Sequence, residues 1–190
     1  MGDLVVTEFL TLDGVMQDPG GSGEFDRGGW SFKFERGPEG DKFKVDELMA
    51  ADAQLLGRVT YEGFAAAWPT IEAGDFGVKF NAMPKFVVSK TLKDPEWNNS
   101  HVLDSGDVAA DVARLKQEFE GNILVAGSAQ LVQGLIALDL VDELRLMVFP
   151  VVLGEGKRLF ADGGDIKTFE LVETGQTGQA STHVFRRKNG

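Results

Sequence analysis

Three short segments place glycine, hydroxyl and basic side chains directly after runs of apolar residues. They are residues 55–60 (LLGRVT), 87–91 (VVSKT) and 125–130 (VAGSAQ). Glycine lets the backbone approach a ligand closely, and arginine or lysine adds charge-assisted hydrogen bonds to phosphate oxygens. Where a strand turns into a helix, free N–H groups and the helix dipole also favour an anion. The chemistry that these segments suit is therefore phosphate binding.

Each segment alone also has an ordinary structural explanation. Glycine with serine is common at a strand-to-helix turn, and a surface arginine with a hydroxyl residue that caps a helix start explains the LLGRVT segment equally well. Agreement among the three is harder to explain in that way, because the carboxyl ends of parallel strands in an open α/β sheet converge on one ligand. Together the segments favour a nucleotide with several phosphates.

Overall composition narrows the class of ligand. The chain has 19 Lys and Arg against 30 Asp and Glu, a net charge of −11 that repels nucleic acid and anionic lipid. It has no cysteine, which excludes disulfides, thiolate nucleophiles and iron–sulfur ligation. Its two histidines, His101 and His183, are far apart and have no companion ligands at metal spacing, so we expect no metal site.

The start of the chain does not have the pattern of a targeting segment. Asp3 stands where a signal peptide carries positive charge, and Glu8 interrupts the apolar run that follows it. No run approaches the roughly 20 apolar residues of a membrane span. We expect a soluble, cytoplasmic protein that binds neither membrane nor nucleic acid.

Hydrophobic periodicity predicts the elements that position these segments. Helices alternate with strands in the first two thirds of the chain, which indicates parallel pairing, and strands follow one another after Asp142, which indicates antiparallel hairpins. We expect one α/β domain over residues 1–190 with a mixed, mainly parallel sheet flanked by helices. The predicted strands are 4–12, 53–57, 85–89, 122–126, 143–153, 169–173 and 181–187; the predicted helices are 42–51, 59–67, 107–119 and one after Gly127-Ser128.

Four motifs, in this order, resemble the dihydrofolate reductase superfamily: LLGRVTYEGFAAAWP, KFVVSKTL, ILVAGSAQLVQGL and DELRLMVFPVVLGEGKRLF. The branch is similar to the C-terminal reductase domain of the bifunctional riboflavin biosynthesis deaminase-reductase. The resemblance covers nearly the whole chain and implies an NADPH site. By this resemblance Gly57, Arg58 and Thr60 hold phosphates, Ser89 and Lys90 hold the 2′-phosphate of the adenosine, and Gly127, Ser128, Ala129 and Gln130 hold the pyrophosphate.

Residues 11–15 (TLDGV) resemble the S-L-D-G motif of the superfamily, which lies beside the nicotinamide and the substrate. Asp13 is then a candidate catalytic residue that orients substrate or relays a proton, while a plain turn at Asp13-Gly14 is the alternative. Val15 stands near the place where the riboflavin enzymes carry a lysine. The folate enzymes also carry an acid on the first helix, but we expect Asp41, Asp46 and Glu47 to lie on a solvated face.

The resulting hypothesis is an NADPH-dependent reductase that transfers a hydride to a small heterocycle, either pterin-like or 5-amino-6-(5-phosphoribosylamino)uracil-like. The alternative is a non-catalytic nucleotide-binding or sensor module of the same fold. The resemblance also implies a homodimer formed through the C-terminal strands. The glycine-rich residues 19–30 are a candidate lid, and Trp30, Phe32 and Phe34 are expected to line a pocket or to lie in the core.

Overall fold

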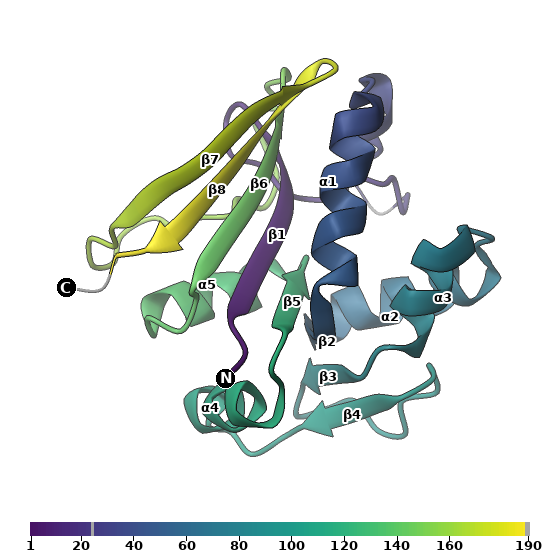
Figure 1. Ribbon diagram of the computed structural model, residues 1–190, viewed down its shortest axis with the longest axis vertical. Helices are drawn as coiled ribbons and strands as arrows, with labels where there is room; N and C mark the ends of the chain where they lie inside the picture. The colour runs from purple at the N-terminus through teal and green to yellow at the C-terminus, as the bar shows by residue number, and fades with distance from the viewer. Residues whose placement is uncertain (24, 189–190) are drawn as a thin grey trace.

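An eight-stranded mixed sheet runs through the protein in the order β4-β3-β2-β5-β1-β6-β8-β7 (Figure 1). The computed structural model describes residues 1–23 and 25–188, so Glu24, within the predicted lid, lies outside the described residues. Neighbouring strands pair in parallel except at β8, which is antiparallel to both β6 and β7. This confirms the mixed sheet. The strands are β1 (Leu4–Thr11), β2 (Ala51–Gly57), β3 (Lys85–Val88), β4 (Ser100–Leu103), β5 (Asn122–Ala126), β6 (Glu143–Phe149), β7 (Phe169–Thr177) and β8 (Ala180–Arg187).

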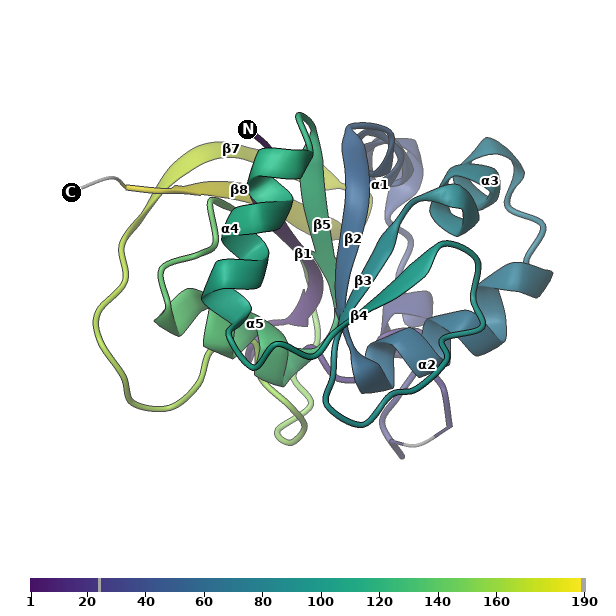
Figure 2. The ribbon, with the colours of Figure 1, turned by 90° about the horizontal axis from the view of Figure 1, so that it is seen from below.

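Helices cover both faces of the sheet (Figure 2). Helices α4 and α5 pack on one face, where their apolar residues join those of β1 and β5 in the largest core cluster. Helices α1, α2 and α3 pack on the other face around a second, aromatic cluster. The helices are α1 (Gly37–Met49), α2 (Arg58–Ala67), α3 (Gly74–Ala82), α4 (Val108–Glu118) and α5 (Ala129–Ala137), with 3-10 turns η1 (Trp30–Lys33) and η2 (Trp68–Thr70).

Helix α4 shows why the periodic pattern was informative. Val112 and Leu115 are buried on its inner face, as the spacing predicts. The side chain of Asp107 accepts a hydrogen bond from the backbone N–H of Ala110 at 3.0 Å, which confirms Asp107 as the N-cap. The cap satisfies one of the first-turn amides that would otherwise have no partner.

Several element boundaries differ from the predicted ones. The strand predicted over 143–153 ends at Phe149, because Pro150 has no N–H to continue the ladder. The first helix begins at Gly37, with a proline at its first turn, rather than at residue 42. Helix α3 and strand β4 were not predicted at all. Helix α3 buries little besides Gly77 and Phe80, so its apolar periodicity is weak.

Strands β1 and β5 separate partway along β1. They pair from Leu4↔Ile123 to Thr7↔Ala126, after which β5 turns into α5 while β1 continues alone beside β6 to Thr11 (Figure 1). Four residues of strand span about 13 Å. We call this point, between Glu8 on β1 and Gly127 after β5, the fork.

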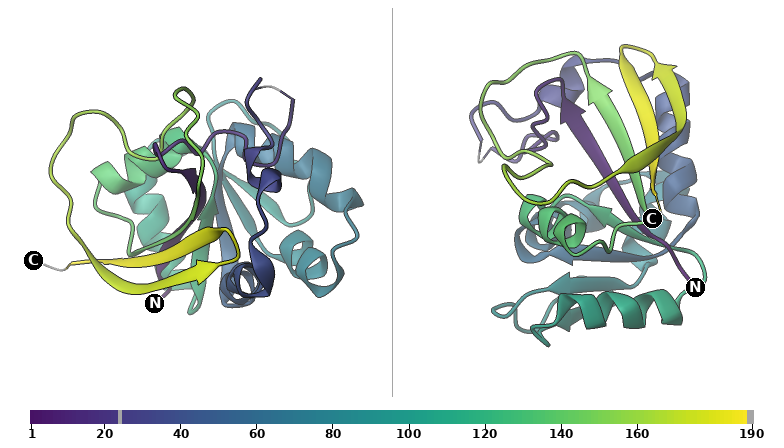
Figure 3. Two further views of the ribbon diagram at one scale, coloured as in Figure 1. Left: turned by 90° about the horizontal axis from the view of Figure 1, so that it is seen from above. Right: turned by 90° about the vertical axis from the view of Figure 1, so that its left-hand side faces the viewer.

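The segment 150–168 between β6 and β7 runs around the edge of the molecule without helix or strand (Figure 3). Its first part returns to the end of β1, where the backbone N–H of Leu12 donates to the carbonyl of Val151 at 2.8 Å. Val15 and Arg158 form an isolated antiparallel bridge nearby. The end of β1 and the start of this segment therefore form one unit beyond the fork.

Candidate functional site

The strand-to-helix turns after β2 and β5 contact each other directly. The backbone N–H of Gly57 donates to Oγ of Ser128 at 2.8 Å, and that hydroxyl donates to Oγ1 of Thr60 at 2.8 Å. A Cβ on Gly57 would lie 2.7 Å from Ser128 Oγ, and a Cβ on Gly127 would lie 2.8 Å from Thr60 Cγ2. Only glycine fits at either position without displacing its neighbour. The sequence predicted both turns, and the structure joins them through Ser128.

The third predicted turn follows on the neighbouring strand. Because Gly57 pairs with Val88, Ser89 and Lys90 leave the sheet beside Arg58. The hydroxyl of Ser89 is buried and accepts the backbone N–H groups of Thr91 and Leu92 at 3.1 and 2.9 Å, so it shapes the turn. Lys90 is exposed. The three predicted segments therefore lie side by side at the carboxyl ends of the neighbouring strands β3, β2 and β5.

Arg58 opens helix α2 and has one partner on its own helix. Its Nη1 donates to both carboxylate oxygens of Glu62 at 3.0 Å, an i,i+4 pair in which both side chains are nearly half exposed. An exposed pair of this kind contributes at most about 1 kcal/mol and breaks easily. Arg58 can therefore leave Glu62 for a phosphate at little cost.

Helices α2 and α5 both begin at these turns without a side-chain cap. Gly57 has no side chain to cap α2, and Ser128, at φ +67°, points its hydroxyl to Gly57 and Thr60 rather than to the first turn of α5. In contrast, α4 is capped by Asp107. First-turn amides and two helix dipoles are thus left for an anion at one place, with a close backbone approach at Gly57 and Gly127. This arrangement fits the phosphates of a dinucleotide such as NADPH.

Asp13 lies beyond the fork and binds protein groups. Its Oδ1 accepts the Thr11 hydroxyl at 2.6 Å and the Leu153 N–H at 3.2 Å, and its Oδ2 accepts the Gly154 N–H at 2.8 Å. The Thr11 hydroxyl and these amides hold the pKa of Asp13 at about 2, below its ordinary value of 3.8. Asp13 therefore remains ionised near neutral pH, which suits an orienting residue and does not suit a proton donor.

A carboxyl that the sequence did not single out lies at the fork itself. Glu8 is 6 % exposed, and its Oε1 accepts the backbone N–H of Gly127 at 2.8 Å. Burial raises the pKa of Glu8 to about 8, although the Gly127 N–H and the charge of Lys44 lower it and the charge of Glu47 raises it. The one signal in the sequence was a charged residue inside the apolar run of β1.

The acidic residues of α1 have three different surroundings. Asp41 and Asp46 are exposed and pair with Arg36 and Lys42, as expected for a solvated face. For Glu47 that prediction is wrong, because Glu47 is 2 % exposed. Its Oε1 accepts the hydroxyl of Thr7 at 2.8 Å and pairs with Lys44, whose Nζ lies 2.6 Å from Thr7 Oγ1. A buried ion pair therefore faces β1 from α1.

The predicted aromatic residues divide between core and surface. Trp30 is fully buried with its ring 5.6 Å from that of Phe149, while Phe34 packs at 6.1 Å against the same ring and Phe32 is exposed. Trp30 Nε1 also donates to the carbonyl of Gln17 at 2.9 Å. Trp30 and Phe34 thus anchor the segment after the glycine-rich loop to the core.

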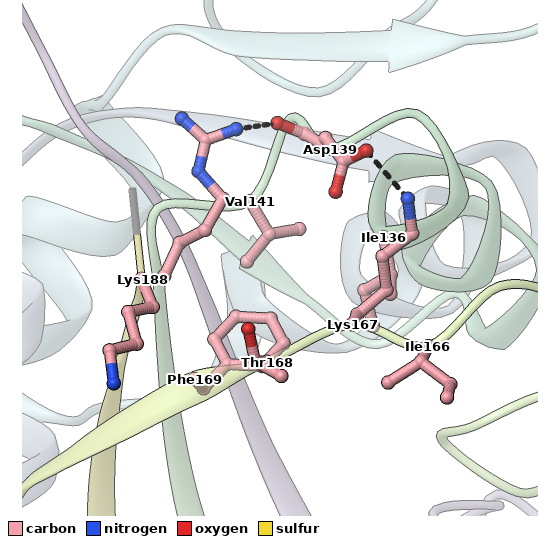
Figure 4. Close-up of a pocket in the computed structure, with 9 residues that line it drawn as sticks. Ile136, Asp139, Val141, Ile166, Lys167, Thr168, Phe169 and Lys188 are labelled. Carbon is pink, nitrogen blue, oxygen red and sulfur yellow. Dashed lines mark hydrogen bonds and ion pairs between the residues drawn. The ribbon is translucent and has the colours of Figure 1, made fainter. Parts of the chain in front are cut away.

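One pocket lies at the opposite end of β6 from these turns (Figure 4). Among its lining residues, Lys167 pairs with the carboxylate of Asp139 and Arg187 donates to the backbone carbonyl of Asp139. Of the three cations that line the pocket, Lys167, Arg187 and Lys188, the first two are engaged by Asp139, so we assign no phosphate to this pocket. Residues 1–23 and 25–188 contain no group of three or more His, Cys, Asp or Glu side chains placed to hold a metal. Within the same part of the chain, no helix is long and apolar enough to cross a bilayer.

This sheet order, with helices on both faces, is a dihydrofolate reductase-like fold. The chain belongs to the RibD C-terminal domain family, which it matches over residues 3–182. It is 34 % identical over 172 residues to the Bacillus subtilis "Uncharacterized protein YwjB", with 90 % of each chain covered.

Two solved structures share the fold. A putative riboflavin biosynthesis protein from Shewanella sp. PV-4 is 20 % identical with a TM-score of 0.73, covering 98 % of this chain and 99 % of that one. Dihydrofolate reductase from Enterococcus faecalis, complexed with NADP(H) and RAB-propyl, is 17 % identical with a TM-score of 0.64, covering 98 % and 97 %. At these identities the likeness shows the fold alone.

Proposed function

We propose that the chain, acting as one domain over residues 1–190, is an NADPH-dependent reductase of a small heterocyclic substrate that is pterin-like or 5-amino-6-(5-phosphoribosylamino)uracil-like. The observation that carries the proposal is the contact between the two uncapped strand-to-helix turns through Ser128. It provides free amides, two helix dipoles and close backbone approach at one edge of the sheet. The family and the fold of its neighbours support the same reading.

Different residues at the carboxyl ends of β2, β3 and β5 would hold different phosphates of the cofactor. The pyrophosphate would be held by amides at the starts of α2 and α5. The residues that would hold it are Gly57, Thr60, Gly127, Ser128, Ala129 and Gln130. Arg58, Ser89 and Lys90 would hold the 2′-phosphate, since Arg58 and Lys90 are exposed cations that follow the paired ends of β2 and β3. When bound, NADPH supplies the hydride. Asp13, ionised and held by Thr11 and Gly154, would orient the substrate or a water molecule.

The proposed function is tested by titrating the purified protein with NADPH, followed by cofactor oxidation with a panel of reducible pterins, pyrimidines and flavin precursors. We expect NADPH to bind more tightly than NADH and one class of heterocycle to oxidise it. Lack of binding would overturn the assignment.

The alternative, a nucleotide-binding or sensor module without turnover, has one specific observation in its favour. The acids that the sequence offered for a heterocycle, namely Asp13, Asp41, Asp46 and Glu47, each already bind a protein group, and only Oε2 of Glu47 is buried without a hydrogen-bond partner among them. Tight binding of NADPH without oxidation by any compound of the panel would select this alternative.

We also propose that two copies associate through the C-terminal strands. Strand β7 is an outer strand of the sheet, and its Leu171 and Val172 are about half exposed. An edge strand presents unpaired backbone groups, which are a ready surface for a second chain. Light scattering coupled to size exclusion should give twice the monomer mass, and Leu171→Lys should restore the monomer. A monomeric wild-type protein would contradict this assembly.

A further inference from the structure

The fork places a buried carboxyl directly against the proposed pyrophosphate turn. Thr7 of β1 pairs with Ala126, the last residue of β5. The residues that follow them, Glu8 and Gly127, therefore meet where the two strands separate. Glu8 Oε1 accepts the Gly127 N–H at 2.8 Å, and the side chain keeps only 6 % of its exposure. The carboxyl therefore occupies one of the amides that would otherwise point at the ligand.

The surroundings of Glu8 do not supply it with a dedicated counter-ion. On β6, the other neighbour of β1, the residue opposite is the apolar Leu146. The charged groups that act on it belong to α1, where Lys44 and Glu47 already pair with each other. Among the described residues, Gly127 provides the only hydrogen bond that Glu8 receives. An ionised carboxyl in this position would be a poorly compensated buried charge.

The two protonation states of Glu8 affect the turn differently. A neutral carboxyl holds the Gly127 N–H through its carbonyl oxygen and adds no net charge beside the ligand. An ionised carboxyl holds the same amide more tightly and sets a negative charge next to the place where the phosphates would lie, where low polarity strengthens the repulsion. Phosphate binding and ionisation of Glu8 are therefore expected to oppose each other.

We propose that Glu8 is a positioning residue of the dinucleotide site, and that it holds the Gly127–Ser128 turn in its phosphate-binding form only while its carboxyl is protonated. This inference rests on the proposed function, because it assigns a proton-linked control to the same site. Burial raises the pKa of Glu8 to about 8, so the neutral form prevails at and below neutral pH. Binding of NADPH then requires one proton at alkaline pH.

The test is the dissociation constant of NADPH between pH 6.5 and 9.5, measured in the wild-type protein and in Glu8→Gln. Glutamine keeps the carbonyl acceptor for Gly127 and cannot ionise. We expect the wild-type Kd to be constant up to about pH 7.5 and to rise by up to about tenfold per pH unit above pH 8.5. Glu8→Gln should bind as the wild type does at pH 6.5 and keep that affinity at pH 9.5.

A matched control removes a different buried carboxylate from the same sheet. Glu143 of β6 is 4 % exposed and pairs with Arg145 and Arg186 at the start of its strand, away from the fork. Glu143→Gln should retain the wild-type dependence of Kd on pH. A flat profile in this variant as well would attribute the effect to general charge and would overturn the role of Glu8.

Calorimetry keeps the inference testable if Glu8→Gln does not fold. At pH 8.5, NADPH binding to the wild-type protein should take up roughly 0.8 proton, read from the dependence of the binding enthalpy on the ionisation enthalpy of the buffer. Binding without proton uptake, or a wild-type Kd that stays constant to pH 9.5, overturns the role of Glu8 and leaves the proposed function intact. Absence of NADPH binding at every pH overturns both.

Discussion

Ser128 and Gly57 belong to turns that are 71 residues apart in the chain, and the hydroxyl of Ser128 accepts the N–H of Gly57 at 2.8 Å. This hydrogen bond fixes the start of α5 against the start of α2. Because the Ser128 hydroxyl is used in this way, it does not cap its own helix. The same contact that joins the two turns therefore leaves the helix amides free for an anion.

The close packing of the two turns predicts that Gly127 cannot be replaced. Its φ is +73°, and an added Cβ would lie 2.8 Å from Thr60 Cγ2. Gly127→Ala should lower the free energy of unfolding by about 1–3 kcal/mol, from the strained backbone and the contact together, and should weaken NADPH binding. Urea denaturation and NADPH titration measure the two effects.

Gly134 of α5 is the matched control, since an added Cβ there meets nothing within 4 Å. Gly134→Ala should leave NADPH binding unchanged and raise stability by up to about 1 kcal/mol, because alanine favours a helix interior. Equal effects of the two substitutions would show that the joined turns are not tightly packed.

We expect the two cations at the ends of β2 and β3, Arg58 and Lys90, to make the protein prefer NADPH to NADH. Each charge-assisted hydrogen bond to the 2′-phosphate contributes about 1.5–3 kcal/mol, less at exposed sites such as these. The double substitution Arg58→Ala with Lys90→Ala should therefore raise the Kd for NADPH roughly ten- to several hundredfold and change that for NADH much less. Titration of both cofactors measures the ratio.

Arg114 of α4 provides a control of the same chemistry. Like Arg58 it is about half exposed and pairs with an i,i+4 glutamate, here Glu118, but it lies on a helix away from the turns. Arg114→Ala should leave both Kd values unchanged. Equal losses for NADPH and NADH in the double variant would place the 2′-phosphate elsewhere.

The sequence was sufficient for the turns and the sheet because their signals are local. Gly57, Ser89 and Gly127 each end an apolar run, and the alternation of helices and strands predicts parallel pairing, which the structure confirms. Strand β4 escaped prediction, since its four residues form an outer strand with only Leu103 buried. A short half-buried strand carries too little pattern to separate it from a loop.

The side-chain partners at the site could not be predicted, because they depend on pairing between distant segments. The sequence pattern alone indicates a solvated helix face for Glu47. In the structure α1 packs against β1, and Thr7 and Lys44 bind the Glu47 carboxylate. Glu8 was visible only as a charge that interrupted an apolar run. Its contact with Gly127 depends on the register of β1 with β5, which no local pattern specifies.

We expect the carboxylate of Asp13 to hold the segment that follows β6 in place, because it accepts the N–H groups of Leu153 and Gly154. In Asp13→Asn one carboxylate oxygen becomes an amide nitrogen, and because each oxygen accepts a backbone N–H, from Leu153 or from Gly154, two donors would face each other in either orientation of the amide. We expect a loss of about 1–2 kcal/mol in stability and faster hydrogen exchange at the amides of Leu153 and Gly154. Asp162→Asn, an exposed change in the same segment, should leave both unchanged.

The low pKa of Asp13, about 2, also determines how this stability difference depends on pH. Because the pKa is depressed in the folded protein, the stabilising effect of Asp13 is complete above its ordinary value of 3.8 and is lost only as the pH falls toward 2. The stability difference between wild type and Asp13→Asn should therefore be constant between pH 5 and 8. A difference that changes within this range would contradict the assignment of Asp13 as an ionised residue held by amides.

The raised pKa of Glu8 gives the free energy of unfolding the opposite dependence on pH. Its pKa of about 8 in the folded protein lies above its ordinary value of 4.5, so the folded state binds the proton more tightly between these values. The stabilising effect is complete below pH 4.5 and is lost as the pH rises to 8, with a slope of at most about 1.4 kcal/mol per pH unit. Urea denaturation of wild type and Glu8→Gln at pH 5, 6, 7 and 8 measures it. The wild-type protein should lose stability relative to Glu8→Gln across this series, since glutamine cannot ionise, and a constant difference between the two proteins would show that Glu8 is not a buried neutral carboxyl.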